Sequence, residues 1–287
     1  MKQLFTLMAA AIFCTAAKAQ SDTTITNKTD TIKIGNMVII KKGGEGSGRK
    51  YTSIDVERRH RSKPSNISTN WGIFDLGFAN YTDKTNYSNT GGYLFDRAGA
   101  APLGKNDFSL NTGKSVDVNI WFFMQRFNLI KHYVNLKYGL GIELNNYRYQ
   151  SSISYLKDNP FAPNQTPSPV IIRDSISFSK NKLATDYVTV PFMINFCTNP
   201  ESNNKGLSLS VGVSAGYLYS QRNKQISNER GKQKTKGGLG LEPFKFSYIA
   251  ELGLGPVHLY GSYAPKTIYK NGLDIRPYTV GVRLSNW

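Results

Sequence analysis

The stretch VNLKYGLGIELNN, residues 134–146, alternates apolar and polar side chains. Valine, leucine, tyrosine and isoleucine occupy the even positions up to 144, and asparagine, lysine, glycine and glutamate occupy the odd ones. A period of two places the two sets on opposite faces of a β-strand. A soluble sandwich would bury the apolar face, whereas a membrane barrel would turn it towards lipid and turn Lys137 and Glu143 towards the lumen.

Seven further stretches show the same alternation, so the sequence predicts eight strands. Most of them reach the roughly 9–11 residues that a tilted strand needs to cross a bilayer. The predicted strands span residues 70–81, 115–127, 133–149, 184–197, 207–219, 244–255, 257–264 and 276–286.

The connections between these strands alternate in length. Short ones cover residues 128–132, 199–206 and 255–256, and longer polar ones cover residues 82–114, 150–183, 220–243 and 266–274. Short turns at one end and long loops at the other are typical of outer-membrane barrels. We therefore predict an all-β fold, an eight-stranded antiparallel up-and-down transmembrane β-barrel. An even strand count puts both termini on the periplasmic side and the long loops outside the cell.

The first nineteen residues have the features of a secretory signal peptide. A short basic start precedes an apolar run of about ten residues, and Ala17 and Ala19 supply the small residues that a signal peptidase reads. Residues 20–69 are predicted as a periplasmic N-terminal segment, with a possible short hairpin over residues 31–42 and a basic linker over residues 43–68. The predicted barrel then spans residues 70–287.

The formal net charge of +17 raises the possibility of a nucleic-acid partner. An export signal and basic residues that lie in connecting segments argue against it, so no nucleic-acid partner is expected. No metal-ligand spacing and no phosphate-binding glycine loop occurs in the sequence, and no cofactor is expected.

The faces opposite the apolar ones define the predicted lumen. Its charges nearly balance, and charges removed from water must be paired. An eight-stranded barrel is only just wide enough for its own side chains. We therefore predict a packed polar lumen rather than an open channel. The predicted network consists of Asp75, Asp117, Lys137, Glu143, Lys245, Glu251, His258 and Arg283.

Enzymatic chemistry has one candidate constellation. His258 and Ser262 share a strand face, and Glu251 lies one strand away. Because serine and histidine are four strand positions apart, a structural ion-pair role for His258 is the preferred interpretation. A lipid-modifying enzyme at the outer leaflet is the alternative.

The segment of residues 220–236 is strongly basic, and contact with lipopolysaccharide phosphates outside the cell is one interpretation of it. The basic residues are Arg222, Lys224, Arg230, Lys232, Lys234 and Lys236. Aromatic residues near strand ends predict an interfacial girdle. The girdle candidates are Tyr81, Phe127, Tyr133, Tyr147, Tyr149, Tyr187, Tyr219, Tyr260, Tyr278 and Trp287.

Three segments carry a family resemblance: TDTIKIGNMVIIKK at residues 29–42, NWGIFDLGFANY at 70–81 and DYVTVPFMINF at 186–196. Together with the signal they resemble the PorT-like outer-membrane β-barrel proteins over residues 31–287. The resemblance implies a Gram-negative outer-membrane barrel, with some relatives that serve protein secretion. The expected function is a non-enzymatic structural or interaction role, with a secretion component or narrow transport channel as the alternative. The expected partners are outer-membrane lipid, lipopolysaccharide and other envelope proteins.

Overall fold

The computed structural model describes residues 29–34, 37–42, 54–58, 65–160, 169–199, 206–255 and 257–284. The chain divides into two compact units, Met1–Lys63 and Pro64–Trp287. The predicted signal peptide, residues 1–19, lies outside the described residues. Among those residues, no helix is both long and apolar enough to cross a membrane.

The first unit contains a three-stranded antiparallel sheet. Its strands are β1 (Thr29–Ile34), β2 (Met37–Lys42) and β3 (Ile54–Arg58), in that order. The first two form the predicted hairpin. The third falls inside residues 43–68, where the sequence predicts a linker. It pairs antiparallel with β2, with Ile54 opposite Lys41 and Arg58 opposite Met37.

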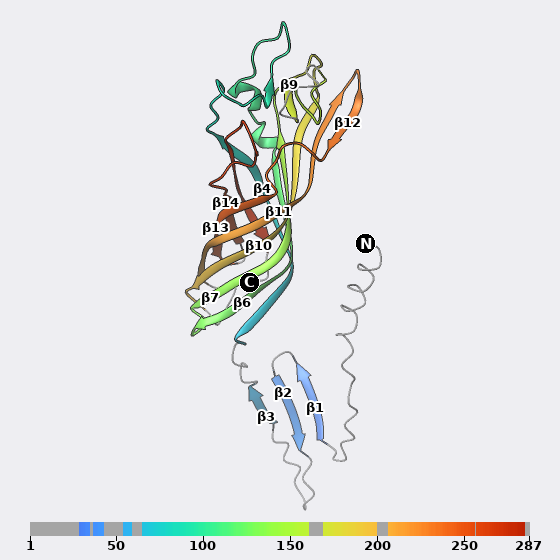
Figure 1. Ribbon diagram of the computed structural model, residues 1–287. Coiled ribbons are helices and arrows are strands. Elements are labelled where there is room, and N and C mark those ends of the chain that lie inside the picture. Colours follow the sequence, from blue (N-terminus) through green and yellow to red (C-terminus); the bar gives the residue numbers. More distant parts are fainter. Residues whose placement is uncertain are drawn as a thin grey trace, which may run out of the picture. The chain divides into compact units, whose positions relative to one another are not determined.

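The second unit is built on a closed ring of eight antiparallel strands (Figure 1). Each strand pairs with the next along the ring, and the last pairs with the first, so the eight-stranded prediction is confirmed. In ring order the strands are β4 (Ile67–Asp83), β6 (Val116–Ile130), β7 (Val134–Arg148), β10 (Lys180–Cys197), β11 (Leu207–Ser227), β13 (Phe244–Leu254), β14 (Val257–Tyr263) and β15 (Ile275–Leu284).

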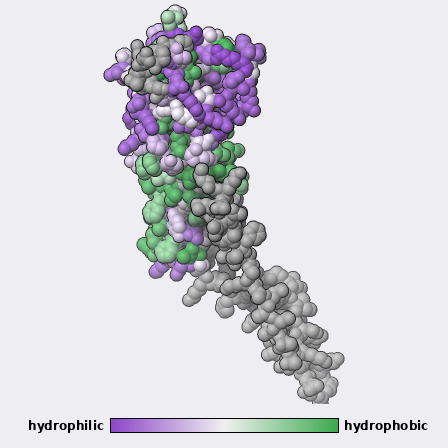
Figure 2. All heavy atoms as spheres, turned by 45° about the vertical axis from the view of Figure 1, so that its right-hand side comes forward, coloured by the Kyte–Doolittle hydropathy of each residue, from purple (hydrophilic) through white to green (hydrophobic). Residues whose placement is uncertain are grey.

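Burial alternates along these strands as the sequence pattern predicts. Every odd position of β7 from Asn135 to Tyr147 is buried, and every even position is partly exposed. Large apolar side chains on the outward face of the ring stay exposed, which makes an apolar belt. The hydrophobic colouring of the ring in Figure 2 shows part of this belt below a hydrophilic region. Members of the belt include Leu76, Phe78, Phe192, Val211, Phe246 and Val280.

The two ends of the ring differ. At one end, here called the turn end, β6 and β7 are joined by residues 131–133 and β13 and β14 by residues 255–256. At the other, the loop end, the long connections carry β5 (Leu94–Phe95), β8 (Ile153–Leu156), β9 (Val170–Arg173), η1 (Lys105–Phe108) and η2 (Thr112–Lys114). The strands β5, β9 and β8 form a small sheet of their own.

These long connections pack around a hydrophobic core, which the sequence does not predict. Phe108, Ile153 and Ile171 are among its fully buried members. Three tyrosines meet within it: the hydroxyl of Tyr155 lies 2.6 Å from those of Tyr149 and Tyr269. We call this packed region the loop cap. Its apolar residues come from separate connections and from the adjoining ends of ring strands, so no local alternation reveals it.

The segment of residues 220–236 is a β-hairpin rather than a loop. β11 is 21 residues long and continues to Ser227, where it turns into β12 (Gly231–Lys236). A membrane-crossing strand needs roughly half that length. β11 therefore extends well beyond the apolar belt, paired with the first residues of β10 on one side and with β12 on the other.

The predicted aromatic girdle is wrong for four of its members. Tyr147, Tyr149, Tyr187 and Tyr260 point inward and are buried, because they share the strand parity of the lumen residues. Phe127, Tyr133 and Tyr219 are exposed at outward positions, Tyr81 and Tyr278 are partly buried, and Trp287 lies outside the described residues.

Candidate functional site

All eight residues of the predicted charge network lie inside the ring. Their side chains are between 1% and 7% exposed, although half of them are carboxylates and most of the others are cations. Buried charges are rare in proteins unless they are paired, so their partners decide what the lumen can do.

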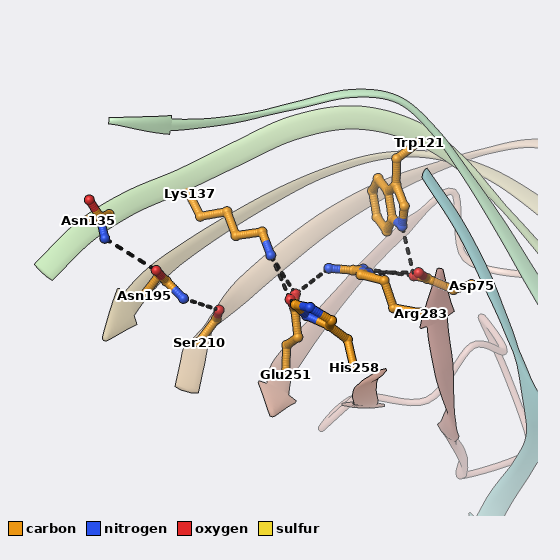
Figure 3. A network of polar contacts seen from close by, with 9 residues as sticks. All are labelled: Asp75, Trp121, Asn135, Lys137, Asn195, Ser210, Glu251, His258 and Arg283. Atoms are coloured by element: carbon orange, nitrogen blue, oxygen red, sulfur yellow. Dashed lines mark hydrogen bonds and ion pairs between the residues drawn. The ribbon is translucent and has the colours of Figure 1, made fainter. Parts of the chain in front are cut away.

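The first group of charges centres on Glu251 of β13 (Figure 3). The Nζ atom of Lys137 lies 2.7 Å from both of its carboxylate oxygens, and Nδ1 of His258 lies 3.0 Å from one of them. Arg283 donates to Glu251 through Nη1 and to Asp75 through Nε and Nη2, the last two at 2.7 Å. One guanidinium thus joins two carboxylates and leaves both oxygens of Asp75 bound.

The strand register explains this group. Arg283 of β15 is directly paired with Asp75 of β4 on one side and with His258 of β14 on the other. The indole of Trp121 on β6 donates at 2.7 Å to Oδ2 of Asp75, the oxygen that also accepts from Nη2 of Arg283. With Lys137 of β7 and Glu251 of β13, six strands therefore contribute to one cluster of hydrogen-bonded charges.

The second group lies nearer the loop end. Lys245 of β13 pairs with Glu143 of β7, and its Nζ atom also lies 4.5 Å from the ring centre of Tyr187. Tyr260 donates its phenol proton to Asp117, which also accepts a hydrogen bond of 3.0 Å from Asn119. The guanidinium of Arg283 stacks near Tyr260, 5.9 Å from its ring centre, and so links the two groups.

Both lysine ion pairs cross the lumen. β7 and β13 are separated by β10 and β11 around the ring, yet Lys137 and Glu143 of β7 reach Glu251 and Lys245 of β13. Side chains that meet across the bore occupy the path that a solute would have to follow.

The sequence predicts a polar lumen, but the observed lumen also contains apolar side chains. Ile73, Trp121, Met124 and Met193 form a small buried apolar layer, with Ile249 packed against it. Two cavities of about 30 and 20 Å³ border the charge network. Each has room for one or two water molecules. The interior glycines belong to the same tight packing: a Cβ atom on Gly77 would lie 2.7 Å from the hydroxyl of Tyr260.

The arrangement around His258 does not assemble a nucleophilic triad. The hydroxyl of Ser262 shares a hydrogen bond of 2.7 Å with that of Thr279, whereas His258 contacts Glu251. Four strand positions separate the serine from the histidine by about 13 Å. Among the described residues, no group of His, Cys, Asp and Glu side chains is arranged to hold a metal ion.

The six basic residues predicted as an anion contact are divided by the hairpin. Arg222, Lys224, Lys232, Lys234 and Lys236 share one face of the β11–β12 sheet, because Lys224 pairs with Lys234 and Arg222 with Lys236. Arg230 lies at the turn, where its guanidinium contacts Asp174 at 3.0 Å.

Three further cations lie beside these residues and are not predicted from the sequence: Arg148, Lys180 and Lys182. Lys182 pairs in register with Lys224 on one side and with Arg148 on the other, and Lys180 lies two residues before it. β10 begins at Lys180 rather than at residue 184, and this extension places the two lysines beside the hairpin. Continuing the alternation of β10 backwards by two positions would have revealed Lys182.

The comparison with known protein families agrees with this architecture. The family described as "Outer membrane protein beta-barrel domain" matches residues 66–264. Among solved structures, the chain is similar to Ail, the attachment invasion locus protein of Yersinia pestis, with 12% identity, a TM-score of 0.29, and coverage of 75% of this chain and 99% of Ail. No curated protein matches the chain. Because the family match covers more than half of the sequence, the chain belongs to the outer membrane protein β-barrel domain family.

Proposed function

We propose that this protein is a plugged outer-membrane barrel with a non-enzymatic, structural or interaction role. The observation that carries the proposal is the pair of cross-lumen ion pairs from β7 to β13, which fill the bore with hydrogen-bonded side chains. The packed loop cap at one end and the small size of the bordering cavities support the same conclusion.

In this proposal the turn end and both chain termini face the periplasm, and the loop cap faces the outside of the cell. The export signal at residues 1–19 supports secretion through the inner membrane followed by its cleavage. Short turns at the periplasmic end are the usual arrangement in outer-membrane barrels. Within the family, the three sequence segments quoted above favour the PorT-like group.

The plugged lumen is tested by planar-bilayer conductance of the full-length protein. The same sample is first checked for heat-modifiable gel mobility, which a folded barrel shows and an unfolded one does not. We expect heat-modifiable mobility without steady conductance. A steady open pore from a heat-modifiable sample would contradict the proposal and favour the transport alternative.

Orientation is tested separately with single cysteines. In a Cys197→Ser background, Asn228→Cys places a thiol at the exposed turn of the β11–β12 hairpin, and Asn199→Cys places one at the turn end. On intact cells a membrane-impermeant maleimide should label the first and not the second. Labelling of the second alone would reverse the proposed orientation.

A further inference from the structure

Beyond the apolar belt, the first residues of β10, the last residues of β11 and all of β12 continue as one antiparallel sheet, next to the end of β7 (Figure 1). Asn223 and Gln225 of β11 point inward and are buried, so the alternate positions form the outward surface. Eight cations occupy that surface, and we call it the basic face. They are Arg148, Lys180, Lys182, Arg222, Lys224, Lys232, Lys234 and Lys236.

The cations of the basic face stand in rows. Arg148, Lys182, Lys224 and Lys234 are consecutive partners across four strands. Neighbouring strands lie about 5 Å apart, so each charge has like charges directly beside it. Like charges directly opposite one another destabilise a sheet. The fold therefore concentrates positive charge here at a cost to its own stability.

The protein itself offers few anions to this face. Asp186 pairs with Arg222, and Lys182 donates to the neutral amide oxygen of Asn146. Within the described part of the chain, none of Lys224, Lys234 and Lys236 has an ion-pair partner. Partial burial, followed by repulsion from the neighbouring cations, lowers the pKa of Lys182 to about 8.

A groove joins the basic face to the apolar belt. It has a volume of about 640 Å³ and is lined by Tyr219, Arg222, Lys234 and Lys236, among others. Directly below it, the rings of Tyr217 and Phe244 are exposed and lie 5.4 Å apart, at the upper edge of the belt. Charge above and apolar surface below match an amphiphile whose phosphate lies in the groove and whose acyl chains lie along the belt.

We infer that the basic face binds the phosphate groups of the glycolipid in the outer leaflet, with the lipid's acyl chains against the adjoining belt. The inference rests on the proposed orientation, in which the loop end faces outward. Lysine is a point-charge ligand for phosphate, and each basic residue near an anionic membrane surface adds to the attraction. Several cations in register favour a headgroup that carries more than one phosphate.

The test measures binding of diphosphoryl lipid A in detergent micelles to the full-length protein. The central row is neutralised in Lys182→Gln/Lys224→Gln/Lys234→Gln. A control with the same loss of charge is Lys105→Gln/Lys114→Gln/Lys270→Gln, at exposed positions in other connections of the loop end. We expect the central-row variant to lose affinity by about tenfold or more and the control by less than about threefold.

Equal losses in the two variants, or no loss in either, would overturn the inference. Phosphatidylglycerol micelles and inorganic phosphate serve as competing anions. If either bound as tightly as lipid A with the same dependence on the central row, the glycolipid assignment would be wrong. Heat-modifiable mobility of each variant shows that the barrel has formed, and conductance tests the plugged lumen independently of lipid binding.

Discussion

Lys137 of β7 extends across the barrel to Glu251 of β13, and its Nζ atom lies 2.7 Å from each oxygen of that carboxylate. Both side chains are almost completely buried. A lysine removed from water this far is tolerated only with a partner of opposite charge. The contact therefore does two things together: it compensates two charges that the ring encloses, and it places their side chains across the bore.

The second crossing pair, Glu143 with Lys245, offers a test of this compensation. Lys245→Met leaves a buried carboxylate without its cation and should destabilise the barrel by about 3–5 kcal/mol. The double variant Glu143→Leu/Lys245→Met removes both charges and should recover most of that loss. Urea unfolding in detergent, followed by heat-modifiable mobility, measures both. If the double variant lost as much stability as Glu143→Leu and Lys245→Met lose in sum, the two residues would not depend on each other.

Tight packing of the lumen predicts sensitivity to a single methyl group. In Gly77→Ala, the added Cβ would lie 2.6 Å from the carbonyl oxygen of Val280 and 2.7 Å from the hydroxyl of Tyr260. We expect a loss of about 1–3 kcal/mol of unfolding free energy. Gly104→Ala is the matched control, since no atom lies within 4 Å of the added Cβ and the backbone is extended. Equal stability of the two variants would contradict a close-packed bore.

The loop cap should open in alkali before the barrel unfolds. Burial raises the pKa of Tyr149, Tyr155 and Tyr269 well above the ordinary value of 10.0. Below pH 10 the phenols are protonated in both the closed and the opened cap, so the closed cap keeps its full stability. Above pH 10 the phenols of the opened cap lose their protons, whereas those of the closed cap keep them. Opening is then favoured by up to about 1.4 kcal/mol per tyrosine and pH unit.

Limited proteolysis of the loop end between pH 8 and pH 11, with a protease active across that range, measures this opening. Cleavage should accelerate above about pH 10 while heat-modifiable mobility persists. In Tyr155→Phe, which lacks one of the titrating phenols, the acceleration should be smaller. If cleavage does not change with pH, the three phenols are not coupled to cap closure.

Lipid A binding should weaken as the pH rises through 8. Lys182 has a lowered pKa of about 8 because it is partly buried among like charges, and a bound phosphate would favour its charged form. Affinity should be highest below pH 8 and fall up to about tenfold by pH 9, as free Lys182 loses its proton. The charged groups around Lys182 are Arg148 on β7, Lys180 and Asp186 on β10, and Arg222 and Lys224 on β11.

Lys182→Arg keeps the positive charge throughout this pH range, so its affinity for lipid A should be nearly constant from pH 7 to pH 9. A fall in affinity that is the same in both proteins would assign the pH dependence to another group.

Strand alternation was sufficient to predict the ring and the inward position of the eight charged residues, because parity along a strand decides which face each side chain joins. It could not predict partners. Lys137 and Glu251 are far apart in sequence, and their meeting depends on the width of the bore and the stagger of the strands. The same parity should have placed Tyr147 and Tyr187 inside, but their position near strand ends suggested a girdle.

The loop cap escaped prediction, whereas the basic face was predicted in part. Its members Arg148, Lys180 and Lys182 were not among the basic residues expected to contact an anion. Phe108 comes from the connection between β4 and β6, whereas Ile153 and Ile171 come from the one between β7 and β10, and only the closed ring brings these connections together. Lys180 and Lys182 lie on a strand that continues past the membrane, where polar outward residues interrupt the apolar alternation that marks a crossing strand.

The crossing contacts also bear on how the barrel inserts. Arg283 and Asp75 are 208 residues apart in the chain, Lys137 and Glu251 are 114 apart, and Glu143 and Lys245 are 102 apart. Strands β4 to β7 therefore carry buried charges whose partners lie on β13 and β15, the later strands. A half-inserted chain would hold these charges in the membrane without compensation, so partial insertion is penalised until the last strands arrive. The ion pairs thus favour complete over partial insertion, because the charges of the first strands are compensated only when the last strands are in place.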